Sequence, residues 1–212
     1  MKTTLRCFTP MIFLALVGLV AGCGGDDSEP GGAAGSAGSG GSGGSGGAGG
    51  DGGGTSDAAD MKIASSTGAW NVYRDPYADG RASPIADTMM GSADAFALGG
   101  GKMRVKLTVS ALPANRPFGS HIHKLACEDT KAGGHYQNNP APDGGANDPA
   151  FANAANEVWL DFVTDASGAA SKETTVDFVP RTGQAKSVVI HDMLTMDGGL
   201  AGAKLACINM PF

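Results

Sequence analysis

Apolar and polar side chains alternate most regularly over residues 102–112. One face of this segment carries Met103, Val105, Leu107 and Val109, and the other carries mainly charged and hydroxyl side chains. Since successive side chains of a strand point to opposite faces, the pattern predicts a half-buried β-strand.

Other short apolar runs lie between turn residues. Residues 157–164 and 172–179 flank a turn sequence at 165–168, and we expect them to pair as a hairpin. Additional strands are expected over 70–73, 187–191 and 205–210. No run of about a dozen residues repeats with the period of a helix, so the pattern predicts an all-β sandwich or barrel.

Residues 138–156 show neither period. They are rich in Pro, Asn, Asp, Gly and Ala, which predicts a long irregular loop. Loops of this length are usually either functional or disordered.

The beginning of the chain is typical of an exported lipoprotein. Residues 1–22 have a basic start and an apolar core at 11–20 that is too short to span a bilayer. The sequence Val-Ala-Gly-Cys then ends at Cys23, where lipidation is expected. We therefore expect a protein of the cell envelope, on the periplasmic or outer-membrane side, attached by an N-terminal lipid. An ordinary secretory signal is the alternative.

Residues 23–59 are expected to be the lipidated cysteine and a disordered Gly/Ser-rich tether, because such a segment buries too little apolar surface to fold. Residues 60–212 then form one domain with 13 Lys and Arg against 16 Asp and Glu. The domain has no basic stripe interleaved with aromatic residues, which argues against nucleic acid as a partner.

The chain has four cysteines. Cys7 leaves with the signal peptide and Cys23 is used for lipidation, so Cys127 and Cys207 remain in an oxidising compartment. A disulfide between them is expected. Metal ligation by both is the alternative, disfavoured because neither has a second cysteine nearby.

The four histidines all lie in this domain. His121 and His123 are two apart on an expected strand, so both project from one face. His135 follows two glycines that permit a tight turn, and His191 ends an apolar strand. A His-x-His pair alone is a weak signal, but four imidazoles around one ion favour Cu(II).

Order and spacing around these histidines carry a family resemblance. The matching stretches are FGSHIHKLAC at 118–127, GGHY at 133–136, SVVIHD at 187–192 and AGAKLAC at 201–207. Residues 100–212 thus resemble the copper/zinc superoxide dismutase family, especially its bacterial periplasmic members.

The resemblance implies a Greek-key β-sandwich or barrel and an enzyme that dismutes superoxide to dioxygen and hydrogen peroxide. It implies that His121, His123 and His191 are permanent copper ligands. His135 would take the position that bridges copper and zinc in the family, and would pass a proton to the product. Family members occur as monomers and as dimers, so no oligomeric state is implied.

The chain departs from the family where zinc would bind, since no histidines remain to supply that site. We therefore expect copper without zinc, as in the copper-only dismutases that the chain resembles. In those proteins a carboxylate orients the histidine equivalent to His135. Glu157 is the first candidate for this role and Asp161 the second, with a solvated strand face as the alternative for both.

Lys204 is a further departure, because the family has an arginine just before Leu-Ala-Cys that guides superoxide. Lysine keeps the charge but lacks the planar fork. The first functional hypothesis is superoxide dismutation with His135 and Lys204 as catalytic residues. A copper-buffering lipoprotein with little turnover is the second, and a structural β-sandwich with incidental histidines is the third.

Overall fold

The computed structural model describes residues 60–142 and 145–212. The expected signal peptide at 1–22, the expected lipidation site Cys23 and the expected tether at 23–59 lie outside the described residues. The strands are β1 (Met61–Ala69), β2 (Asn71–Val72), β3 (Met90–Ala97), β4 (Met103–Ser110), β5 (Pro117–His123), β6 (Phe162–Val163), β7 (Ala170–Val176), β8 (Ser187–His191) and β9 (Lys204–Asn209). Short 3₁₀ turns are η1 (Gly99–Gly101) and η3 (Asp197–Gly199). No helix among the described residues is long and apolar enough to cross a membrane.

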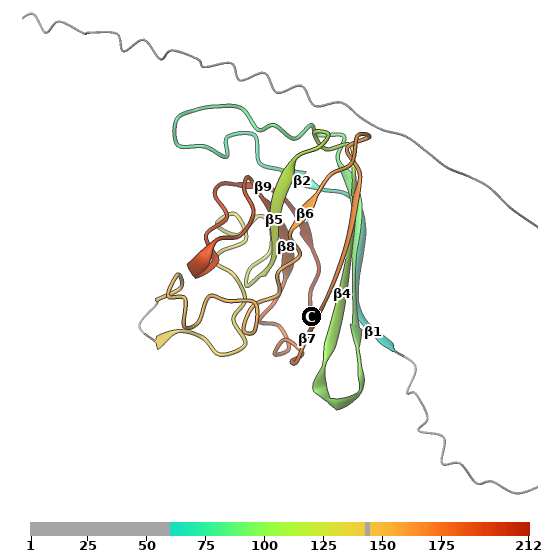
Figure 1. Cartoon of the computed structure of the whole chain (residues 1–212), viewed down its shortest axis with the longest axis vertical. Coiled ribbons are helices and arrows are strands. Elements are labelled where there is room, and N and C mark those ends of the chain that lie inside the picture. The colour runs from blue at the N-terminus through green and yellow to red at the C-terminus, as the bar shows by residue number, and fades with distance from the viewer. Residues whose placement is uncertain (1–59, 143–144) are drawn as a thin grey trace, which may run out of the picture. The chain divides into compact units, whose positions relative to one another are not determined.

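These strands form two antiparallel sheets (Figure 1). Sheet 1 has the order β1-β3-β4-β7, and sheet 2 has the order β2-β9-β8-β5-β6. The all-β sandwich expected from the sequence is therefore confirmed.

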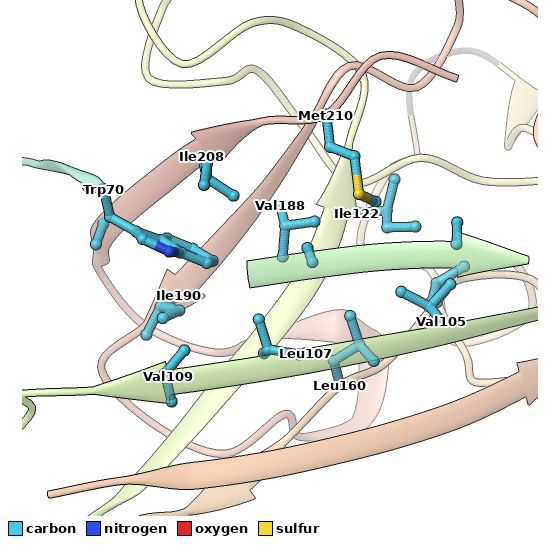
Figure 2. Close-up of a cluster of buried hydrophobic side chains, with 14 of the residues drawn as sticks. Trp70, Val105, Leu107, Val109, Ile122, Leu160, Val188, Ile190, Ile208 and Met210 are labelled. Carbon is cyan, nitrogen blue, oxygen red and sulfur yellow. The ribbon is translucent and has the colours of Figure 1, made fainter. Parts of the chain in front are cut away.

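Strand β4 shows why the two sheets pack face to face. Met103, Val105, Leu107 and Val109 are at most 1% exposed, and the residues between them point outward. Figure 2 shows Val105, Leu107 and Val109 facing Ile122, Val188 and Ile190 from β5 and β8 across the interior. Burying apolar side chains contributes roughly 25 cal/mol for each Å² removed from water, so this face fixes the register of β4.

Non-consecutive strands lie side by side in both sheets. Strand β7 pairs with β4 in sheet 1, and β8 pairs with β5 in sheet 2. The chain therefore crosses repeatedly between the two sheets of the sandwich.

The predicted hairpin between 157–164 and 172–179 is wrong. The turn at 165–168 is present, with the Gly168 amide bonded to the Asp165 carbonyl. However, it carries the chain from sheet 2 to sheet 1, where β7 pairs with β4 along its whole length. A period of two fixes which face a strand buries but does not fix its partner.

Two further expectations differ from the structure. Only Phe162–Val163 of 157–164 is regular strand, because the preceding residues make single contacts to β5 and direct their carboxylates into a site. The structure also contains β1 and β3, which pair with each other but were not predicted. Their small residues, mainly Ala, Ser, Thr and Gly, give little apolar alternation.

Two long segments, 124–161 without residues 143–144 and 192–203, lie on the side of sheet 2 that faces away from sheet 1 (Figure 1). The described part of 138–156 consists of turns, as expected for an irregular loop. A disulfide between Cys127 and Cys207 ties the first segment to β9. Around it, Ala132 and Val189 form a second small buried cluster on this outer face.

Candidate metal centre

Strand alternation places three of the histidines on the outer face of sheet 2. His121 and His123 flank Ile122, whose side chain belongs to the core between the sheets. His191 ends the neighbouring strand β8, directly opposite Gly119 in the β5 register. A Cβ at Gly119 would lie 2.5 Å from the Met193 carbonyl oxygen, so glycine is needed for the close approach of the segment after His191.

The fourth histidine arrives from a loop. Lys124 and Tyr136 donate backbone hydrogen bonds to Gly134 and Ile122, respectively, which fold the loop back onto β5. His135 thereby forms an isolated β-bridge with His123. The turn passes through positive φ at Gly133, as the two glycines in the sequence predict.

Together the four imidazoles form one cluster. His121, His123, His135 and His191 each offer one ring nitrogen, and these four atoms lie within 4.8 Å of one another. Their ring centroids are 3.9 to 6.4 Å apart. His121 and His123 are completely buried, and the His135 side chain is 15% exposed. Among the described residues this is the single group of three or more potential metal ligands.

Three of the imidazoles are oriented by a hydrogen bond through Nδ1. His123 Nδ1 lies 3.0 Å from the Gly133 carbonyl oxygen, and His191 Nδ1 lies 3.3 Å from that of Gly202. His135 Nδ1 lies 2.8 Å from Glu157 Oε2. Carbonyl and carboxylate oxygens only accept, so Nδ1 carries the hydrogen in each ring and Nε2 keeps its lone pair.

His121 makes its hydrogen bond through Nε2 instead. Its Nε2 lies 2.7 Å from Thr195 Oγ1, which in turn donates to Asp161 Oδ1 at 2.7 Å. Since the hydroxyl hydrogen is used towards Asp161, Nε2 of His121 donates and Nδ1 keeps its lone pair. That Nδ1 is buried and has no hydrogen-bond partner among the described residues.

Both predicted carboxylates contact this centre. Glu157 is completely buried, and besides His135 it accepts hydrogen bonds from Gln137 Nε2 and Trp159 Nε1, both at 2.9 Å. Asp161 acts one step further away, through Thr195 rather than directly on an imidazole. Carboxylates and carbonyls in these positions fix the ring orientation and tautomer of histidine ligands.

Burial keeps the strand histidines neutral. Loss of hydration lowers the pKa of His121 and His123 well below 6.5, with neighbouring imidazoles adding to the effect. The same cause lowers the pKa of His191 to about 3, although its hydrogen bond to Gly202 opposes the shift. Neutral imidazole is the form that binds metals.

These contacts fit a metal ion. The Nε2 atoms of His123 and His191 are 3.1 Å apart and both present lone pairs, so they do not hydrogen-bond to each other. A cation bound by both atoms would use these two lone pairs, and also the lone pair on the buried Nδ1 of His121. Two imidazole nitrogens that bind one ion from opposite sides, each about 2.1 Å from it, are about 4.2 Å apart. The four ring nitrogens of the cluster lie within 4.8 Å of one another, so they would need to move only slightly closer to bind one ion. This buried histidine cluster could therefore bind a metal ion.

A cavity of about 300 Å³ leads to the cluster. His123, His135, His191 and Lys204 line it, and Lys204 contributes its one positively charged side chain. Lys204 Nζ donates to the carbonyl oxygens of Lys131 and Gly133, and its pKa is lowered by burial and by the nearby Lys131 charge. Since none of the lining residues that the structure describes carries a carboxylate, the cavity favours a small anion.

Three polar contacts of this centre were not predicted from the sequence. Thr195, Gln137 and Trp159 each complete a hydrogen bond to a histidine or to Glu157. None belongs to a motif with a recognisable spacing, because each acts through a contact that the fold creates. Thr195, a hydroxyl residue four positions after His191, is the feature of the sequence that comes nearest to predicting one of these contacts.

Comparison with known proteins adds little. No family model matches the chain, and no curated protein matches it. One solved structure, described as that of the clock protein EA4, is 15% identical to the chain. The similarity covers 71% of this chain and 95% of the other, with a TM-score of 0.45.

Proposed function

We propose that the protein dismutes superoxide at a single copper ion held by its four histidines. One observation carries this proposal: four imidazoles, three of them buried, each offer one ring nitrogen within 4.8 Å of the others, beside a cavity that the Lys204 side chain lines. The resemblance of the four sequence stretches supports the same reading. Export as a lipoprotein remains part of the proposal and rests on the sequence.

Copper is favoured over zinc by the donor set. All four candidate donors are imidazole nitrogens, which suits a tetragonal Cu(II) site. Glu157 occupies Nδ1 of His135, the atom that a second metal would need in order to share this imidazole. We therefore propose one copper and no zinc in each chain.

Copper, when bound, would supply one-electron redox chemistry between Cu(II) and Cu(I). The overall reaction consumes two superoxide anions and two protons and yields dioxygen and hydrogen peroxide. The protein must therefore deliver protons as well as hold the ion. His135 suits this task because its Nε2 faces the centre while Glu157 keeps its Nδ1 hydrogen-bonded. A proton taken up at Nε2 would give an imidazolium whose charge the Glu157 carboxylate stabilises.

Lys204 has two tasks in this scheme. Its ammonium attracts superoxide into the cavity, and its hydrogen bond fixes the Gly133 carbonyl that also holds His123. Two of its three N–H groups are used by carbonyl oxygens, which leaves one for an incoming anion.

The test is superoxide decay measured with purified full chain loaded with copper, against free copper in the presence of a chelator. We expect decay well above that control, and we expect His191→Gln to abolish it. Loading with copper and zinc together should give one copper and no zinc per chain. Full copper occupancy without decay above the control would overturn the proposal.

Copper buffering without turnover is the second candidate, because both Lys131 and Gly133 engage the Lys204 ammonium. Lys204→Arg and Lys204→Met separate the two functions. For an enzyme, we expect Met to lower the rate at least about tenfold and to weaken its dependence on ionic strength. A buffer would show copper binding in all three proteins and negligible turnover in each.

A further inference from the structure

We propose that a second cavity, behind the metal centre, binds a small organic anion: an oxyanion group on an apolar body. The cavity has a volume of about 320 Å³. Its lining residues are Lys124, Leu125, Tyr136, Gln137, Pro140, Arg181, Gly183, Gln184 and Lys186. This site is separate from the proposed dismutase site and does not depend on it.

Charge is the first argument. Three of the lining residues, Lys124, Arg181 and Lys186, are cationic, and none of the lining residues in the described part of the chain is acidic. Among the described residues, no carboxylate lies within 4.0 Å of the Lys124 or Lys186 ammonium. Like charges gathered around a concave surface raise the local concentration of anions.

Arg181, one of the three cations, is held in place by several contacts. Arg181 donates to Gln184 Oε1 and to the carbonyl oxygens of Gln137 and Asn138, and its guanidinium lies over the Tyr136 ring. These contacts use three of its five N–H groups, and no carboxylate in the described part of the chain lies within 4.0 Å of the guanidinium. Arg181 therefore contributes a fixed positive charge, and the two lysines contribute ammonium donors.

Both lysines start from ordered backbone. The Lys186 amide donates to the His123 carbonyl, and the Lys186 carbonyl accepts from Met210. The Lys124 amide donates to the Gly134 carbonyl, and the end of its side chain lies over Gly134. Both lysines thus line the same cavity from backbone positions that are hydrogen-bonded to neighbouring segments.

Size and apolar lining argue for an organic ligand rather than a bare oxyanion. Leu125, Pro140, Gly183 and the ring of the buried Tyr136 line the cavity beside the cations. Its volume is at the lower end of the range found for small-molecule sites, about 300 to 1,000 Å³. A phosphate ion fills only part of this space, whereas a phosphate ester or carboxylate with a ring-sized body also covers the apolar wall.

The two cavities have one lining residue in common, Gln137. Its Nε2 donates to the Ala146 carbonyl and to Glu157, so the amide forms part of the wall between them. Since no histidine lines the second cavity, its occupancy can be measured with or without copper. Failure of the dismutase proposal would leave this result unaffected.

The probes are phenyl phosphate and benzoate, titrated into purified full chain by calorimetry, with inorganic phosphate and phenol as the matched partial ligands. We expect at least one of the two organic anions to bind at least about tenfold more tightly than either partial ligand. Which of them binds more tightly distinguishes a phosphate ester from a carboxylate as the class of ligand.

Lys124→Ala and Lys186→Ala should each weaken binding about tenfold, the effect of losing one charge-assisted hydrogen bond. Lys106→Ala on the outer face of sheet 1 removes the same charge elsewhere and should change the Kd less than twofold. The proposal is overturned if neither organic anion binds at about 10 mM, ten times the Kd of a complex as weak as about 1 mM. It is also overturned if inorganic phosphate binds as tightly, or if Lys106→Ala weakens binding equally.

Discussion

Glu157 and His135 form a hydrogen bond of 2.8 Å between Oε2 and Nδ1, and this contact fixes the one histidine that a loop supplies to the cluster. Trp159 and Gln137 donate to the same carboxylate, which is completely buried. Glu157 is thus held in one orientation before it holds His135. The position of Glu157 explains how the His135 ring can be oriented without a second metal ion.

Replacing Glu157 by Gln should lower copper affinity about tenfold to a hundredfold. Glutamine has nearly the same shape, but its amide can donate to Nδ1 and so favours the tautomer in which Nε2 of His135 carries the hydrogen. That tautomer has no lone pair for the ion. Competition with a chelator of known affinity measures the change. Glu173→Gln on β7 is the control, and an equal loss in both variants would contradict the role.

Thr195→Val should also weaken copper binding, by about tenfold, because it removes the acceptor for His121 Nε2 and a partner of Asp161. Thr195→Ser keeps the hydroxyl and should restore the affinity to within about twofold. The same chelator competition measures both. If Ser fails as badly as Val, the methyl group rather than the hydrogen bond matters, and the assigned contact is wrong.

The metal-free protein should lose stability as the pH falls below about 6.5. Unfolded imidazoles take up protons there, whereas burial holds the folded pKa of His121 and His123 well below 6.5 and that of His191 at about 3. The stabilisation is therefore fully present above pH 6.5 and is lost as the pH falls towards 3. For His191 alone the loss at pH 5 is about 2 kcal/mol.

Denaturant unfolding of the metal-free full chain between pH 7.5 and 5 measures this slope. His191→Asn removes one of the three depressed groups, so its stability should fall less steeply over the same range. A free energy of unfolding that is constant from pH 7.5 to 5 would show that the folded imidazoles titrate normally.

Removing the disulfide with Cys127→Ser and Cys207→Ser together should lower the free energy of unfolding by about 4 kcal/mol, as expected for a closed loop of this length. The bond joins residues 80 positions apart. Chemical denaturation of the full chain measures the loss. The wild type in reducing agent is the matched comparison, and a loss below about 1 kcal/mol in both would contradict a stabilising role.

Sequence patterns predicted the strands whose apolar faces are strong. Strand β4 has four large apolar side chains on one face, and β8 is apolar apart from Ser187 and His191 at its two ends. Strand β3 was missed because Ala93 and Ala95 provide its buried face, and alanine contrasts weakly with serine and glycine. Strand pairing was harder to predict than strand location, as β7 shows, because the apolar pattern of a strand does not indicate which strand it pairs with.

The sequence by itself determined which residues could form a metal centre. It contains four histidines, places two of them on one strand face, and leaves one cysteine pair in the domain. These are local properties of residue type and spacing. The resemblance to copper-only dismutases adds Glu157 and Asp161, both within the expected strand 157–164, as candidates for a carboxylate that orients His135, without placing either.

Only the tertiary structure decided how these residues are used. Glu157 contacts His135 directly, whereas Asp161 reaches His121 through Thr195. Such contacts join residues distant in the sequence, and their geometry depends on the crossing of the chain between two sheets. Hydrogen bonds require positions accurate to a few tenths of an ångström, which residue spacing along a strand cannot specify.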